Sequence, residues 1–102
     1  MTVTIFPGVP LTGTLDAIPS KSAAHRLMIC AALADGPTTI TCPRRSQDID
    51  ATLRCLTGLG ASFRPQGKGY LVTPAAQETR ADHCLLDCGE SGSTLRFLLP
   101  VA

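Results

Sequence analysis

Two short stretches of the chain combine small or hydroxyl residues with basic side chains where a helix is expected to begin. The first is IPSKSAAHR, with Lys21, Ser22 and Arg26, and the second is CGESGSTLR, with Gly92 and Arg96. Unpaired backbone N–H groups at a helix start carry a partial positive charge, and an arginine one turn along lies on the same helix face. Together these groups suit a phosphate or carboxylate, so the sequence predicts two anion-binding helix starts.

A purely structural interpretation of the same residues stays open. Ser20 or Ser22 would then be only a helix N-cap, and Gly92 would only allow a turn. Arg26 would form a salt bridge with Asp16 or Asp48. A Walker-type P-loop is excluded, because GxxxxGK[ST] does not occur in the chain, and GESGS does not match GxGxxG.

Neighbouring polar residues give weaker signals. His25 lies off the face shared by the serine and arginine of the first stretch, so we predict a structural role for it rather than a catalytic one. Asp48 and Asp50 stand near the expected start of the second helix and are interpreted as cap and helix-dipole partners. Asp87 and Glu90 are spaced as a carboxylate pair could be, but spacing alone does not establish one.

The composition is that of one small globular domain. The chain has 102 residues, a net charge of +1 and 44% hydrophobic residues, and its basic residues are scattered. We therefore expect neither a nucleic-acid nor a membrane partner. The N-terminus lacks the features of a signal peptide, so a cytoplasmic location is expected. The five cysteines form no CxxC pair and are expected to be buried thiols, without zinc or disulfides.

Periodicity and turn residues predict alternating strands and helices. The expected strands are 2–6, 12–18, 38–42, 61–65, 70–74 and 84–88, the last of them buried. The expected helices are 20–34, with a buried body at 27–33 and Gly36 as the left-handed residue that ends it, a second from Ser46 to Gly58 or Gly60, and a third after the Gly/Ser loop at 89–93. Residues 75–83 are expected to form a polar loop. The predicted fold is an α/β (α+β) chain with one βαβαββ unit and the start of a second.

The last residues, 97–102, form an apolar run that no later residues could cover. Such a run needs an opposing surface, so we expect the chain to be a piece of a larger protein. Self-association through this end stays open.

Taken together, the motifs resemble the N-terminal part of the EPSP synthase (3-phosphoshikimate 1-carboxyvinyltransferase) family. The resemblance runs in order over essentially the whole chain: GTLDAIPSKSAAHR at 13–26, AALADG at 31–36, SQDIDATL at 46–53, LGA at 59–61 and DCGESGSTLRF at 87–97. One alternative is the related enolpyruvyl transferase that acts on UDP-N-acetylglucosamine, although that enzyme typically has Lys-Asn where this chain has Lys21 and Ser22. The other alternative is a βαβαββ binding module without catalysis.

The resemblance implies a reaction and an architecture. The family transfers the enolpyruvyl group of phosphoenolpyruvate to the 5-hydroxyl of shikimate 3-phosphate in aromatic amino acid biosynthesis, the route to chorismate, with no metal and no cofactor. Its fold is an inside-out α/β barrel of βαβαββ units in two domains. Residues 1–15 would then pack with the other domain, and residues 16–102 would be a truncated N-terminal domain. The full-length family member is expected to be a monomer, and the fragment alone is expected not to turn over.

The resemblance also implies roles for single residues. Lys21 would lie between the two substrates and, as the catalytic residue, stabilise developing charge. Ser22 and Arg26 would bind shikimate 3-phosphate, and Gly92 would let the backbone approach phosphoenolpyruvate. Supporting roles are expected for four further residues: Asp48, Glu90, Ser93 and Arg96.

Overall fold

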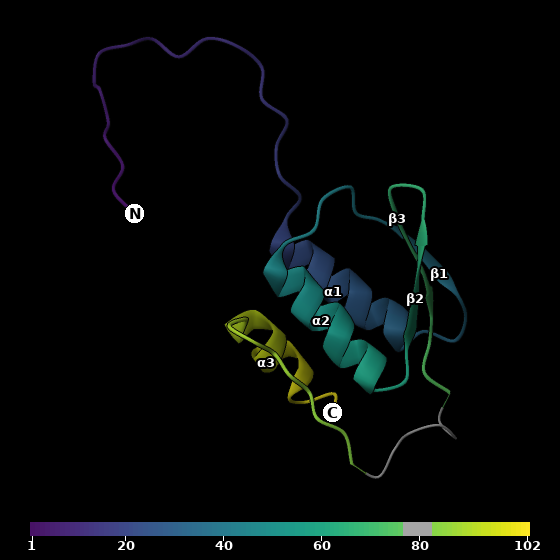
Figure 1. The fold of residues 1–102 in the computed structure, drawn as a ribbon. Helices are drawn as coiled ribbons and strands as arrows, with labels where there is room; N and C mark the ends of the chain where they lie inside the picture. Colours follow the sequence, from purple (N-terminus) through teal and green to yellow (C-terminus); the bar gives the residue numbers. More distant parts are fainter. Residues whose placement is uncertain (77–82) are drawn as a thin grey trace.

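The computed structural model describes residues 1–76 and 83–102 and has a mixed α and β fold (Figure 1). The elements, in chain order, are α1 (Lys21–Ala32), β1 (Thr38–Thr41), α2 (Gln47–Gly58), β2 (Ser62–Gln66), β3 (Gly69–Thr73) and α3 (Gly92–Leu98). None of the helices in these two ranges is long and apolar enough to cross a membrane. The predicted α+β class is therefore confirmed at this level.

The three strands form an antiparallel sheet in the order β1-β3-β2. β2 and β3 make the predicted hairpin, in which Phe63 lies opposite Val72, and Gly67 in the turn has a φ of 56°. β1 pairs with the other side of β3 and places Ile40 opposite Tyr70. Ile40, Tyr70 and Val72 are all buried, because their side chains alternate onto one face of the sheet.

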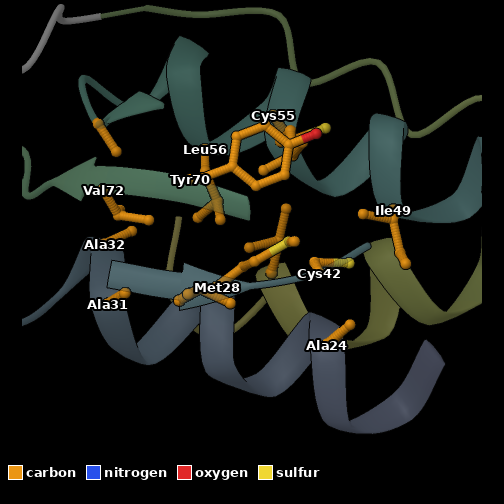
Figure 2. Close-up of a cluster of buried hydrophobic side chains, with 14 residues drawn as sticks. Ala24, Met28, Ala31, Ala32, Cys42, Ile49, Cys55, Leu56, Tyr70 and Val72 are labelled. Carbon is orange, nitrogen blue, oxygen red and sulfur yellow. The ribbon is translucent and has the colours of Figure 1, made fainter. Parts of the chain in front are cut away.

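The core lies between this face and the helices. α1 and α2 lie side by side against the sheet, and α3 packs against both helices on the side away from the strands (Figure 1). Met28 of α1, Ile49 and Leu56 of α2 and Val72 of β3 belong to one buried cluster (Figure 2), and none of them is more than 2% exposed. Each such side chain contributes about 1.5–3 kcal/mol of hydrophobic stabilisation relative to an exposed position.

Local signals set most helix ends. Ser20 and Ser46 each accept a hydrogen bond of 3.3 Å from the backbone N–H three residues later, so the predicted N-caps of α1 and α2 are confirmed. Gly60 follows α2 with a φ of 102°, which only glycine adopts readily. The predicted end of α1 is wrong, since Gly36 is not in the left-handed region. The helix closes earlier, at Leu33, whose N–H reaches two carbonyls of the last turn.

Three of the predicted strands are wrong. Residues 2–6 and 12–18 lie in an exposed segment without helix or strand (Figure 1), and residues 84–88 form a loop in which Leu85 is 90% exposed. An alternating sequence becomes a strand only when a neighbouring strand completes its hydrogen bonds. In the described ranges no strand lies beside these segments. Most of the predicted loop at 75–83 falls on 77–82, outside the described residues.

The apolar body of α1 is buried on one side only. Met28 and Ala31 are buried, but Leu27 and Leu33 are 56% and 53% exposed, so the prediction of a wholly buried body at 27–33 is wrong. The side of α1 that carries Met28 and Ala31 faces the sheet and the other two helices, which α1 contacts. The sequence shows that a second apolar side exists, but not whether a neighbour covers it.

The five cysteines are free thiols in different surroundings. Cys42 and Cys55 are buried as predicted, whereas Cys30 and Cys84 are exposed and contradict that prediction. The Sγ atoms of Cys55 and Cys88 lie 3.9 Å apart. Burial, and next the contact with Cys88, raise the pKa of the Cys55 thiol to about 11. The Cys55 thiol is therefore protonated near neutral pH and is a poor nucleophile.

Gly69 is the glycine whose replacement should most disturb the sheet. A Cβ placed there would overlap the backbone carbonyl of Ile40 across the β1–β3 pair. We expect Gly69→Ala to lower the free energy of unfolding by about 1–3 kcal/mol, because the strands must move apart to admit the methyl group. Gly36→Ala is the matched control, since a Cβ there meets no described atom within 4 Å. Urea unfolding of the two variants tests this, and equal stabilities would contradict it.

Candidate functional site

Lys21 is the first residue of α1 and faces the start of α2. Its Nζ donates to Asp48 Oδ2 over 3.1 Å, and the two side chains are 54% and 36% exposed. An ion pair this open to water contributes about 0–1 kcal/mol to stability. Another anion can therefore replace Asp48 as the partner of Lys21 at little cost.

Arg26 lies one turn further along α1 and folds back onto Ser22. Its Nη1 donates to the Ser22 carbonyl over 3.1 Å and also contacts the Ser22 hydroxyl. The guanidinium carbon lies 4.7 Å from the centre of the Phe97 ring of α3, which is a cation–π contact. Ser22 and Arg26 thus share a face, as the spacing predicts. The alternative salt bridge to Asp16 or Asp48 is not formed between these described residues.

The second predicted helix start is the start of α3. Ser91 is its N-cap and accepts a 3.2 Å hydrogen bond from the Thr94 N–H. Gly92 is the first helical residue, and a Cβ there would meet no described atom within 4 Å. Gly92 has no positive φ either, so the turn-only interpretation does not explain why this residue is glycine. Ser93 and Arg96 are exposed on the same helix.

Asp48 connects the two helix starts. Its carboxylate accepts from Lys21, and its backbone carbonyl accepts from the Thr94 hydroxyl over 3.3 Å. Beside it lies a cavity of about 390 Å³, lined by Gln47, Asp48, Asp50, Ala51, Arg54, Cys88, Gly89, Glu90 and Ser91. Three carboxylates in this lining oppose an anionic ligand, and Lys21, Ser22 and Arg26 lie outside it. The cationic side chains are therefore the better candidates for anion binding.

Asp87 fixes the loop before α3. Its Oδ1 accepts a 2.9 Å hydrogen bond from the Gly89 N–H, and its carbonyl accepts a 3.1 Å hydrogen bond from Arg54. These two bonds hold Gly89 in its left-handed conformation, with a φ of 53°. No interaction recorded among the described residues joins Asp87 to Glu90, so the suggested carboxylate pair has no support from the geometry.

Arg44 and Arg45, which were not predicted as site residues, lie near Lys21. A small cavity of about 130 Å³ is lined by Ile18, Pro19, Lys21, Arg44, Arg45, Ser46 and Ile49. Arg45 is engaged by Asp50, with its Nε 3.4 Å from Oδ1. The available signal was the pair of arginines directly before the N-cap of α2, where positive charge opposes the helix dipole.

The motifs that build both helix starts are those of a known family. A model of the family described as EPSP synthase (3-phosphoshikimate 1-carboxyvinyltransferase) matches residues 5–102. The chain belongs to the EPSP synthase family. The resemblance expected from the sequence is thereby confirmed.

Curated relatives carry the same family name. The 3-phosphoshikimate 1-carboxyvinyltransferase of Clostridium beijerinckii is 42% identical over 105 residues, which cover 96% of this chain and 24% of the relative. That of Clostridium perfringens is 38% identical over 92 residues, covering 90% and 22% of the two chains. The chain thus spans about a quarter of the length of these EPSP synthases. No solved structure matches it.

In this EPSP synthase family chain, His25 is buried inside the helical layer. The residue is 1% exposed, its Nδ1 lies 2.6 Å from Thr52 Oγ1, and its ring centre lies 6.1 Å from that of Phe97. Burial lowers the pKa of the imidazole. The charge of Asp48 opposes this shift, and the positive charges of Lys21 and Arg26 add to it. The ring is therefore uncharged at neutral pH.

Acid should destabilise the chain partly through His25. The unfolded chain takes up this proton near the ordinary pKa of 6.5, whereas the folded chain resists it, so the free energy of unfolding should fall as the pH drops through 6.5. His25→Gln should lose part of this dependence, and the exposed His83→Gln should keep it. Urea unfolding at about pH 7.5 and about pH 5 measures both slopes. Equal slopes in the two variants would rule out His25 as a source.

Proposed function

We propose that the protein transfers the enolpyruvyl group of phosphoenolpyruvate to the 5-hydroxyl of shikimate 3-phosphate. The observation that carries this proposal is the junction at Asp48, where Lys21 of one anion-binding helix start and Thr94 of the other meet on a single residue. A reaction between two small polyanions needs two such sites side by side. Membership of the EPSP synthase family supports the choice of substrates.

The residues divide between the two substrates. Ser22 and Arg26 bind shikimate 3-phosphate, because they form one donor face on α1. Gly92 lets the backbone of α3 approach phosphoenolpyruvate, in keeping with the open space beside it. Lys21 leaves Asp48 and contacts both substrates. Supporting roles fall to Asp48, Glu90, Ser93 and Arg96.

The reaction makes one C–O bond and breaks another. The 5-hydroxyl of shikimate 3-phosphate loses its proton as its oxygen adds to C2 of phosphoenolpyruvate, and C3 gains a proton to give the tetrahedral intermediate. This intermediate then loses phosphate from C2 and a proton from C3 to leave the enolpyruvyl ether. Lys21 stabilises the negative charge that develops during this reaction, because its position as the first residue of α1 lets its ammonium group reach both sites. Residues outside this chain handle the protons.

The proposal includes the architecture and setting of the family. Residues 21–73, from α1 to β3, belong to one βαβαββ-type unit, and α3 belongs to the next unit of an inside-out α/β barrel. Residues 1–15 pack with the other domain, which supplies partner strands that residues 1–76 and 83–102 do not provide, and residues 16–102 belong to the N-terminal domain. The enzyme acts as a cytoplasmic monomer on small anions, without nucleic acid, membrane or cofactor.

The test uses the complete protein, meaning the product of the whole reading frame that contains these 102 residues. Phosphate release from phosphoenolpyruvate should depend on shikimate 3-phosphate and should not occur with UDP-N-acetylglucosamine. Release with the UDP-sugar instead, or a stop codon directly after Ala102, would overturn the assignment. The 102-residue chain alone should show no turnover and at most weak binding in calorimetry, and nanomolar affinity would contradict this division of the site.

A further inference from the structure

Four buried polar side chains, three from the three helices and one from the N-cap of α3, form one hydrogen-bonded series, which we call the hydroxyl chain: His25, Thr52, Thr94 and Ser91. His25 Nδ1 lies 2.6 Å from Thr52 Oγ1, Thr52 Oγ1 lies 2.8 Å from Thr94 Oγ1, and Thr94 Oγ1 lies 2.6 Å from Ser91 Oγ. The four residues are between 0% and 5% exposed. Buried polar groups are costly unless they are paired, so the hydrogen bonds that join these four side chains favour one arrangement of the helices.

The direction of each hydrogen bond follows from the number of protons. The Asp48 carbonyl can only accept, so Thr94 uses its single hydroxyl proton there, over 3.3 Å. Thr94 must then accept from the hydroxyls of Ser91 and Thr52. Thr52 has no second proton for His25, so all these contacts are satisfied only when His25 Nδ1 carries a proton and donates it.

This proton count determines the state of the imidazole. A neutral ring with its proton on Nδ1 has an unprotonated Nε2. The His25 Nε2 atom is buried and has no hydrogen-bond partner among the described residues. An added proton on Nε2 would be unpaired and would lie among the charges of Lys21, Arg26 and Asp48, of which the two cations disfavour it. The neutral Nδ1–H form is thus the one that this packing accepts.

The two ends of the hydroxyl chain lie next to the residues proposed to bind the two substrates. His25 directly precedes Arg26, whose guanidinium lies on Phe97 of α3. Ser91 is the N-cap of α3 and directly precedes Gly92. Thr94 also holds the carbonyl of Asp48, whose carboxylate holds Lys21. A change anywhere along the hydroxyl chain would therefore move the start of α3 relative to α1.

We propose that Thr52 and Thr94, together with His25 as its neutral Nδ1–H tautomer, are positioning residues that set the start of α3 against Lys21 and so align phosphoenolpyruvate with the acceptor. The positioning role presupposes the enolpyruvyl transfer proposed above, whereas the tautomer does not. None of the three side chains touches a substrate; they act through Ser91 and Asp48.

Nitrogen-15 NMR of the histidine-labelled 102-residue chain tests the tautomer directly. Near pH 7 we expect the His25 ring to be neutral with the proton on Nδ1, and the signals are assigned by their loss in His25→Gln and their retention in His83→Gln. Thr52→Val should abolish this preference, because the acceptor of the Nδ1 proton is gone. An Nε2–H tautomer or an imidazolium in the unaltered chain would overturn the proton count.

Kinetics of the complete protein test the positioning role. Thr52→Val and Thr94→Val should raise the KM for phosphoenolpyruvate about tenfold and leave the KM for shikimate 3-phosphate within about twofold, because a small displacement of α3 affects one substrate half. Thr52→Ser should restore the KM, since it keeps the hydroxyl. Thr57→Val is the matched control, as that hydroxyl bonds only to the Leu53 carbonyl of its own helix among the described contacts.

The outcomes separate the two proposals. A lower melting temperature with both KM values unchanged would assign Thr52 and Thr94 a structural role only and would overturn the positioning role. If Thr52→Val does not fold, the comparison of Thr94→Val and Thr52→Ser with Thr57→Val decides in the same way. No turnover by the unaltered complete protein, with the Nδ1–H tautomer present, would refute the proposed function and leave the proton count standing.

Discussion

Replacing Lys21 with alanine in the complete protein is expected to lower kcat/KM by about 10³-fold, which is about 4 kcal/mol of transition-state stabilisation. The reason is its position: Lys21 is the first residue of α1 and is held at the junction of the two helix starts by Asp48, 3.1 Å away. A cation at this point can stabilise negative charge on either substrate. Steady-state kinetics with each substrate varied in turn measure the loss.

Lys68→Ala is the matched control for this experiment, because Lys68 is an exposed lysine between β2 and β3. It should change kcat/KM by less than about twofold. The stability of both variants should stay within about 0.5–1 kcal/mol of the unaltered protein, since exposed ion pairs contribute little. Activity of Lys21→Ala equal to that of Lys68→Ala would remove Lys21 from the site.

The second large effect concerns the core and can be measured on the 102-residue chain. Leu56→Ala is expected to lower the free energy of unfolding by about 2–5 kcal/mol, because Leu56 is 1% exposed at the contact between α2 and the sheet (Figure 2). The alanine would leave a cavity that neighbours such as Met28 and Val72 cannot fill without moving. Small domains have a total stability of about 5–15 kcal/mol, so this variant should be close to unfolding.

Leu85→Ala removes the same atoms from an exposed loop and is the control for the core variant. Leu85 is 90% exposed, so its loss should change stability by less than about 0.5 kcal/mol. Urea unfolding followed by circular dichroism measures both variants. A Leu56→Ala chain as stable as Leu85→Ala would show that the packing between α2 and the sheet differs from the arrangement described.

Elements with complete local signals could be predicted from the sequence. α2 has a serine N-cap, apolar residues at helical spacing and a glycine stop, and the structure places it at Gln47–Gly58. The β2–β3 hairpin likewise follows from two short strand-like runs around a glycine turn. In both cases the residues that specify the element are near one another in the chain, so no distant partner had to be known.

The wrong strand predictions and the wrong burial of the α1 body depended on neighbouring segments that the sequence does not identify. Residues 2–6, 12–18 and 84–88 have strand-like composition, but a strand also needs a neighbour, and the described part of the chain provides none. The same holds for Leu27 and Leu33, whose apolar side chains imply a cover without identifying it. Burial of a side chain is a property of the surface around it, and local periodicity contains no information on that surface.

The candidate site was predictable in its types of residue and only partly in its contacts. Helical spacing alone placed Ser22 and Arg26 on one face. The pairing of Lys21 with Asp48 joins residues 27 positions apart, and the hydroxyl chain joins Thr52 to Thr94 over 42 positions. Threonines in a helix give no signal of such a bond, because their hydroxyls most often bond to the preceding turn.

If the proposed function holds, the different surroundings of Arg26 and Lys21 imply an order of events when a dianion binds. Arg26 rests on a serine and an aromatic ring and has no carboxylate partner among the described residues, so its full charge is available for the first encounter. Lys21 must release the Asp48 carboxylate before it binds the dianion, so one ion pair replaces another. Added salt should therefore slow capture at Arg26 more than it weakens the exchange at Lys21, because the exchange leaves the number of ion pairs unchanged.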